Sequence, residues 1–183
     1  MNKKELRAEM KEKRKRLSAE SAKEMSRRIC ENFWESDFYK NANSIALYMA
    51  IGNEVDLSEL IKRAFKDKKR VFVPVTDKEN KDIDLFEISE DTVWVKGDFG
   101  ILEPEKRIPC NGVDVMLVPG IAFSFHGARV GWGGGFYDRL IPKMNAVTVG
   151  ICYDFQITGT IETEPHDLFM NYILTESELV ICD

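Results

Sequence analysis

The sequence predicts an α/β protein, a three-layer, Rossmann-like single domain over residues 1–183 with a mostly parallel central sheet. Segments with strand periodicity alternate along the chain with segments of helical periodicity. Two strand segments, 113–118 (VDVMLV) and 147–152 (VTVGIC), are apolar on both faces, which is typical of central strands covered by helices. No internal repeat, low-complexity tract or linker marks a domain boundary.

The helices are predicted from periodicity and from capping signals. Residues 2–16 form a charged helix, and a second helix follows Ser21, whose spacing to Glu24 is that of a capping box. A further helix begins at Asp56, where Glu59 repeats the same spacing.

The remaining elements complete the alternation. Residues 45–50 form a strand, and 71–75 form another in which Pro74 indicates an irregular or edge position. Residues 83–88 form a third, peripheral strand, and a helix over 136–141 separates the two central strands. Such an order favours parallel strands joined by right-handed crossovers.

Ligands in open α/β sheets bind beyond the carboxyl ends of the strands. This rule selects the loops that follow residues 50, 118 and 152. The unusual residues of the sequence lie in or near these loops, so we expect the functional site there.

Composition excludes several classes of protein. Hydrophobic residues make up 44% and charged residues 31% of the 183, as in ordinary globular proteins. No apolar run approaches the ~20 residues of a membrane helix, and residues 1–18 are too charged for a signal-peptide core. The four cysteines have neither zinc-site nor disulfide-framework spacing. We therefore expect a cytoplasmic protein with no membrane partner. It is also expected to be a monomer.

Charge is unevenly distributed. Residues 1–30 hold 11 Lys or Arg and 5 Glu, a formal +6, so the rest of the chain must carry −11 to give the net −5. This asymmetry indicates either an anion-binding end or a solvated helix face. The acidic total argues against nucleic acid as a partner.

The most informative segment is the glycine-rich stretch 129–139 (RVGWGGGFYDR). Its four glycines leave the backbone free to turn N–H groups toward an anion, and the following helix adds its positive dipole end. Arg129 and Arg139 can make forked hydrogen bonds to phosphate. The stretch is neither a Walker A motif nor a G-x-G-x-x-G fingerprint. It predicts a polyphosphate site, with a simple strand-to-helix turn as the alternative.

The same stretch resembles the signature of the 5-formyltetrahydrofolate cyclo-ligase family, also called 5,10-methenyltetrahydrofolate synthetases. The resemblance covers essentially the whole chain. Further segments similar to family motifs follow in the family's order: Lys3-x-x-Leu6-Arg7, Tyr48-Met49, Asn53-Glu54, Phe99 to Pro104, Val118 to Phe123, Asp154 to Gln156 and Pro165 to Asp167.

Three positions depart from the family pattern. Trp132 and Phe136 stand where the family often has other residues, frequently tyrosine, and Gly134 stands where some members carry lysine. Roles that need a phenol hydroxyl or an ammonium there do not transfer. Ring stacking and backbone contacts do.

The resemblance implies an ATP-dependent ligase of folate and one-carbon metabolism. The expected reaction converts 5-formyltetrahydrofolate to 5,10-methenyltetrahydrofolate, with phosphorylation of the formyl oxygen, attack by N10, and release of ADP and phosphate. ATP is then a co-substrate and Mg²⁺ a cofactor. Phosphoryl transfer needs alignment and stabilisation of negative charge, which amides, cations and a metal supply.

The resemblance also assigns residues to roles. Arg129 is the expected catalytic residue, and Asp138 and Asp167 are expected Mg²⁺ ligands. The residues expected to bind ATP are Lys3, Lys4, Glu5, Leu6, Arg7, Arg129, Val130, Gly131, Trp132, Gly133, Gly134, Gly135, Phe136 and Tyr137. Those expected to bind the folate are Met49, Glu54, Trp132, Gly133, Gly134, Gly135 and Phe136.

Several of these residues have plainer alternative roles. Asp138 and Glu54 could stabilise helix starts as exposed charges, Asp167 could belong to a surface turn, and Met49 could be core. Both histidines, His126 and His166, are expected to have surface or hydrogen-bonding roles.

Two rival functions remain open. A sugar-phosphate isomerase or acyl-CoA transferase could use the same fold, because fold does not fix function. Those activities need a catalytic glutamate rather than MgATP, and the N-terminal Lys/Arg motif argues against them. A non-catalytic binder of folate or nucleotide would keep the pocket without turnover.

Overall fold

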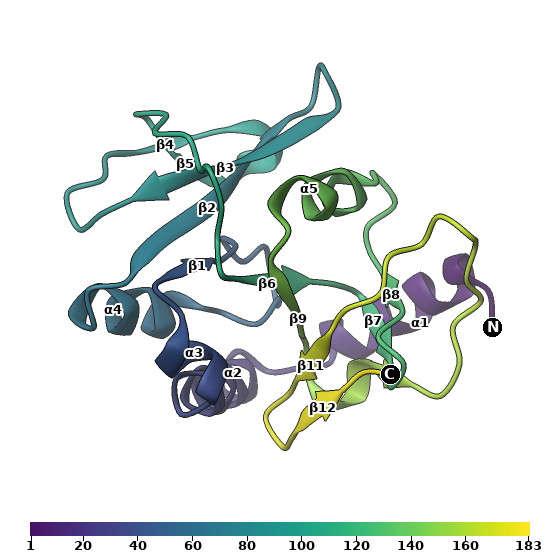
Figure 1. Ribbon diagram of the computed structural model, residues 1–183. Helices are drawn as coiled ribbons and strands as arrows, with labels where there is room; N and C mark the ends of the chain where they lie inside the picture. The colour runs from purple at the N-terminus through teal and green to yellow at the C-terminus, as the bar shows by residue number, and fades with distance from the viewer.

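The computed structural model describes all 183 residues and is built around one seven-stranded sheet (Figure 1). The strands are β1 (Ser44–Ala46), β2 (Arg70–Asp77), β3 (Asp82–Ile88), β6 (Val115–Pro119), β9 (Val147–Ile151), β11 (Tyr172–Leu174) and β12 (Leu179–Ile181). Their order is β12-β11-β9-β6-β1-β2-β3, with parallel pairing from β11 to β2 and antiparallel pairing at both ends. This confirms the predicted mostly parallel sheet, with β6 and β9 central and β3 at the edge.

Helices cover both faces of the sheet and complete the predicted three layers (Figure 1). Side chains alternate along the strands, so Ile45 and Leu117 join the core under one set of helices while Ala46 and Met116 join the other. The face with Ile45 and Leu117 is covered by α2 (Ala19–Trp34), α3 (Asp37–Asn41) and α4 (Ser58–Lys66), and the face with Ala46 and Met116 is covered by α5 (Phe136–Met144).

No helix combines the length and apolar character needed to cross a bilayer.

Two small sheets, which the sequence did not predict, flank the central one. The three-stranded sheet has the order β10-β7-β8, and the helix α1 packs on it through Leu6 and Met10. The two-stranded sheet pairs β4 with β5, and β5 contacts β2 (Figure 1). These elements are α1 (Lys3–Lys15), β4 (Trp94–Lys96), β5 (Leu102–Pro104), β7 (Ala122–Ser124), β8 (Arg129–Val130) and β10 (Ile157–Thr158).

Helix α2 begins earlier than its capping-box spacing predicts. Its N-cap is Ser18, whose Oγ accepts a hydrogen bond from the backbone N–H of Ser21 at 3.1 Å. Glu24 does not reach back to a cap but pairs with Arg27 and Arg28. The prediction placed the start three residues too late because two serines with helical flanks compete for the same role.

Helix α4 also starts differently from the prediction. It begins at Ser58, and its N-cap Leu57 has no side-chain cap. The Asp56 carboxylate instead accepts from the Ser58 N–H at 2.9 Å, a local turn just before the helix. The predicted box between Asp56 and Glu59 is therefore wrong.

Pro74 lies in an internal strand, yet it breaks no strand pairing. The last residue of β1 in register with β2 is Ala46, opposite Phe72. Phe72 accepts a hydrogen bond from Leu47, and Pro74, two residues later, faces the same side beyond the end of β1. β1 is three residues long rather than the predicted six. No residue of β1 therefore lies opposite Pro74, and the absence of a proline N–H costs no hydrogen bond between these strands.

Candidate active site

One large cavity of about 730 Å³ opens at the carboxyl ends of the parallel strands. The chain runs from β1 toward one edge of the sheet through β2 and from β6 toward the other through β9, so β1 and β6 flank a topological switch point. The loop after β1 contributes Tyr48, Ile51 and Glu54 to the cavity, and the end of β6 contributes Pro119.

The loop after residue 152 does not line this cavity, contrary to the prediction. Tyr153 is fully buried, and the Gln156 side chain donates to the carbonyl groups of Gly120 and Ile121, each at 3.0 Å. The loop therefore supports the turn after β6 from behind.

The glycine-rich loop presents a run of free backbone donors. None of the N–H groups from Gly131 to Asp138 donates to another protein atom, including the first three of α5. Two carbonyl groups of the loop are held by arginines: Arg7 Nε donates to Gly131 O at 2.8 Å and Arg139 Nη2 to Gly134 O at 3.1 Å. The loop thus has its amides unpaired at the start of a helix, the usual arrangement for binding phosphate.

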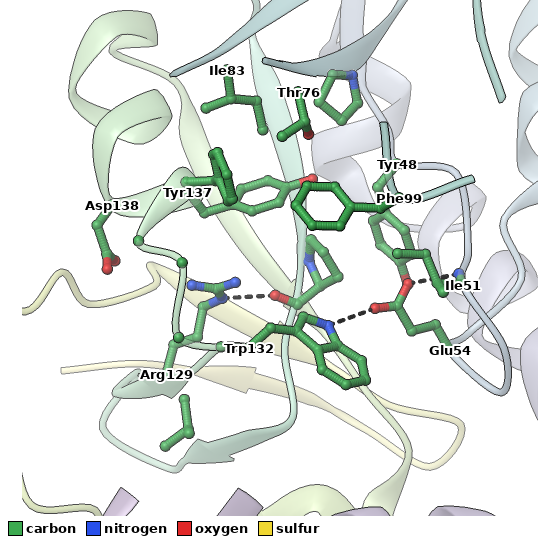
Figure 2. A pocket seen from close by; sticks show the side chains of 18 of the residues that line it. Tyr48, Ile51, Glu54, Thr76, Ile83, Phe99, Arg129, Trp132, Tyr137 and Asp138 are labelled. Carbon is green, nitrogen blue, oxygen red and sulfur yellow. Dashed lines mark hydrogen bonds between the residues drawn. The ribbon is translucent and has the colours of Figure 1, made fainter. Parts of the chain in front are cut away.

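Arg129 reaches into the cavity from β8 and is firmly held. Its Nε donates to Pro119 O at 2.7 Å, and its guanidinium lies 5.1 Å from the ring centroid of Tyr137 (Figure 2). Burial lowers its pKa from the ordinary value, but an arginine remains charged in proteins. The terminal nitrogens stay available for an anion because only Nε is used.

Glu54 and Trp132 join the β1 loop to the glycine-rich loop (Figure 2). Trp132 Nε1 donates to one carboxylate oxygen of Glu54 at 3.1 Å, and the Ile51 N–H donates to the other at 3.0 Å. Burial raises the pKa of Glu54, and these two hydrogen bonds together with the nearby Arg14 and Arg129 offset only part of that effect.

An aromatic wall closes another side of the cavity, and sequence reasoning assigned only part of it. Phe99 packs edge-on against Phe136 with ring centroids 6.0 Å apart, and it has φ +59, a left-handed conformation that is strained for phenylalanine. The motif at 99–104 was a usable signal for it. Thr76 and Ile83 also line the cavity, and nothing local in the sequence marked them.

The two expected metal ligands both line the cavity but differ in their surroundings. Lys3 Nζ lies 2.6 Å from Asp167 Oδ2, which also accepts from the Glu164 N–H. Partial burial by itself would raise the pKa of Asp167, but the Lys3 ammonium and the Glu164 N–H lower it on balance. Asp138 is exposed and has no hydrogen-bond partner.

Asp167 also lies close to His166 and Glu164, and their ligand atoms are within 4.8 Å of one another. His166 is exposed at the rim, with Nε2 3.1 Å from Glu164, and the exposed His126 lies outside the cavity. Oxygen donors suit Mg²⁺, so Asp138 and the free oxygen of Asp167 fit such an ion, whereas Lys3 occupies the other oxygen.

Three expected ATP-binding residues point away from the cavity. Lys4 is exposed, Glu5 forms the capping box with Asn2 at the start of α1, and Leu6 is buried in the core. The structure brings the other expected residues to one cavity: Lys3, Arg7, Met49, Glu54, Arg129, Val130, Gly131, Trp132, Gly133, Gly134, Gly135, Phe136, Tyr137, Asp138 and Asp167.

Comparison with known proteins gives a consistent assignment. The profile of the 5-formyltetrahydrofolate cyclo-ligase family matches residues 1–176. A 5-formyltetrahydrofolate cyclo-ligase of Saccharomyces cerevisiae is 31% identical over 163 residues, 73% of this chain and 76% of that protein. A probable enzyme of the same name from Caenorhabditis elegans is 27% identical over 99% of this chain and 96% of its own length.

A solved structure agrees with the fold as well as the sequence. The Aquifex aeolicus 5,10-methenyltetrahydrofolate synthetase superposes with a TM-score of 0.88 and 32% identity, covering 99% of this chain and 93% of that one. The match of the family profile, together with the similarity in sequence and fold, therefore places the chain in the 5-formyltetrahydrofolate cyclo-ligase family.

Proposed function

We propose that this chain uses ATP to convert 5-formyltetrahydrofolate to 5,10-methenyltetrahydrofolate, releasing ADP and phosphate. The observation that carries the proposal is the run of unpaired N–H groups from Gly131 to Asp138, which faces the same cavity as Arg129 and Glu54. The relatives and the solved neighbour bear names of this activity.

The chemistry explains why such a site is suited to the reaction. A formamide is a poor electrophile because its nitrogen donates into the carbonyl, and its oxygen is a poor leaving group. Transfer of the γ-phosphoryl group of ATP to the formyl oxygen forms a P–O bond and breaks the bond to ADP. The N10 amine then attacks the formyl carbon and loses its proton, and phosphate leaves with the former formyl oxygen.

Phosphoryl transfer requires positioning and charge stabilisation rather than a protein nucleophile. In our proposal the loop amides and the N-terminus of α5 bind the phosphates, and Lys3 and Arg7 contribute charge from α1. Arg129 stabilises the transferring group, because Pro119 and Tyr137 fix its guanidinium while both terminal nitrogens remain free.

The folate is proposed to bind on the side of Glu54. An ionised carboxylate there accepts hydrogen bonds from the N–H groups of a reduced pterin, and Trp132, Phe136 and Met49 offer apolar surface for its rings. In this proposal the substrate lies at the switch point with its formyl group toward Arg129.

Mg²⁺ is proposed to accompany the nucleotide. Asp138 and Asp167 would hold it together with phosphate oxygens, and the ion would neutralise phosphate charge. The pairing of Lys3 with Asp167 keeps that carboxylate oriented and ionised. We further propose that the protein is a single-domain monomer located in the cytoplasm. The molar mass measured by light scattering during gel filtration tests whether it is a monomer.

The test follows product formation directly. Purified protein is mixed with 5-formyltetrahydrofolate, and the near-UV absorbance of the methenyl product is followed with and without MgATP. The proposal predicts that this absorbance increases only when MgATP is present, and that one ADP is formed for each methenyl group. Tight folate binding without turnover would indicate a non-catalytic binder. If the protein neither binds the folate nor responds to MgATP, the sugar-phosphate isomerase or acyl-CoA transferase alternative would be favoured instead.

A further inference from the structure

The backbone of the glycine-rich loop is held by a single residue of the helix that follows it. From Trp132 to Gly135 no N–H group donates to a protein atom, and only two carbonyl groups accept a hydrogen bond. Both bonds come from Arg139: its backbone N–H donates to Gly135 O at 3.3 Å, and its Nη2 donates to Gly134 O at 3.1 Å. The shape of this part of the loop therefore depends on Arg139.

The guanidinium of Arg139 lies outside the proposed phosphate site. Gly134 and Gly135 line the main cavity, but Arg139 does not. Arg139 is exposed and lies against the ring of Phe136, with its guanidinium carbon 5.0 Å from the ring centroid. The same ring covers Gly134, where an added Cβ would lie 2.7 Å from it. Phe136 therefore keeps the guanidinium next to the carbonyl group of Gly134.

The carbonyl group of Gly134 determines which way the next amide points. The peptide bond is trans, so the C=O of Gly134 and the N–H of Gly135 point in opposite directions. Because the carbonyl oxygen is directed to Arg139 outside the cavity, the Gly135 N–H is directed into the cavity. Gly135 has φ +67 and is the N-cap of α5. Glycine adopts negative φ about as readily, so this peptide unit can turn over if nothing holds it.

A turned peptide unit would oppose the binding of phosphate. It would point the carbonyl oxygen of Gly134 at the phosphates, and it would remove one N–H donor from the N-terminus of α5, where the helix dipole favours an anion. We propose that Arg139 is a positioning residue for ATP, which rests on the function proposed above. It holds the peptide between Gly134 and Gly135 with its N–H toward the phosphates and does not contact them itself. The alternative is that the guanidinium moves into the cavity and binds phosphate directly.

The affinity for MgATP tests what the side chain of Arg139 contributes. Arg139→Ala keeps the backbone N–H and removes only the bond to Gly134 O. It should weaken MgATP binding about three- to tenfold, as expected for one partly exposed hydrogen bond from a charged group. Affinity is measured by titration calorimetry without folate. The affinity for the folate alone and the free energy of unfolding should stay close to the wild-type values.

Two further variants control for the charge and for the helix. Arg139→Lys should bind MgATP within about twofold of the wild type, because an ammonium can donate to the same carbonyl oxygen. Lys143→Ala should also keep the wild-type affinity, since Lys143 lies on the same helix but pairs with Asp82 and Asp84.

The conformation of the loop without nucleotide distinguishes positioning from direct contact. The two three-bond couplings between the amide and α protons of Gly135 report its φ angle, and they are measured by NMR in protein labelled with ¹⁵N at glycine. The positioning role predicts that these couplings change in Arg139→Ala, return in Arg139→Lys and stay at their wild-type values in Lys143→Ala.

Several results would overturn the positioning role. If the Gly135 couplings are unchanged in Arg139→Ala while MgATP binds more weakly, the guanidinium contacts phosphate directly. Wild-type affinity for MgATP in Arg139→Ala would show that the orientation of this peptide does not matter. A wild-type protein that binds no MgATP would instead reject the proposed function.

Discussion

Arg129 is held in place from three sides. Pro119 accepts its Nε–H, Tyr137 lies against its guanidinium, and Gly131 leaves room beside it. Two substitutions can therefore be compared: one that removes the Arg129 side chain, and one that only shifts its position.

Replacement of Arg129 by alanine should slow turnover strongly. Loss of one donor that stabilises transition-state charge typically costs about 2.7–4 kcal/mol, or about 10²–10³-fold in kcat. Steady-state kinetics and urea unfolding are measured together, with Arg70→Ala as the control because Arg70 makes an exposed pair with Glu87 away from the cavity. A loss of unfolding free energy as large as the rise in activation free energy would make Arg129 structural.

Gly131 tests the same idea without removing the arginine. A Cβ there would lie 2.9 Å from Arg129 Nη2, so Gly131→Ala should displace the guanidinium and lower kcat by about tenfold or more. Gly159→Ala is the matched control, because no atom lies within 4 Å of its added Cβ. Full activity in Gly131→Ala would show that the position of Arg129 does not matter.

Glu54 predicts a pH dependence of stability. Burial raises its pKa above the ordinary value of 4.5, so the folded state holds the proton more tightly than the unfolded state. Stability from this group is present at low pH and is lost as pH rises through the raised pKa. Relative to Glu54→Gln, which does not titrate, the wild type should therefore gain unfolding free energy between pH 7 and pH 5. Urea unfolding measures the difference, and a constant or opposite difference would contradict the pKa direction.

At the scale of elements, the sequence predicted the helices α1, α2, α4 and α5 but missed the short α3, and it misplaced the starts of α2 and α4. Apolar residues at helical spacing identify α2 and α4, because each buries one face against the sheet. Their first residues depend on which of several short polar side chains meets a free N–H, and a spacing rule cannot distinguish Ser18 from Ser21.

The two serines provide a direct test of the α2 boundary. Ser18→Ala removes the side chain that caps Ser21 N–H and should lower the free energy of unfolding by about 1 kcal/mol. Ser21→Ala lies inside the first turn and should change it by less than about 0.5 kcal/mol. Thermal or urea unfolding measures both, and the reverse ranking would restore Ser21 as the cap.

At the scale of the whole molecule, the sequence predicted the sheet and two of its three ligand-bearing loops. The runs at 113–118 and 147–152 read as central strands because both of their faces are buried. The small sheets around β7 and β4 escaped prediction, since strands of two or three residues are too short to show a period. Phe99 reaches the cavity from the turn between β4 and β5, so its position depends on tertiary packing.

The central claim is that the glycine-rich loop binds the phosphates of ATP through its own amides. Protein labelled with ¹⁵N only at its 12 glycines gives a simple amide spectrum that can be titrated with MgATP. The account predicts saturable shifts for Gly131, Gly133, Gly134 and Gly135, with little change at Gly112 and Gly159. A titration that left the four loop signals in place would contradict it.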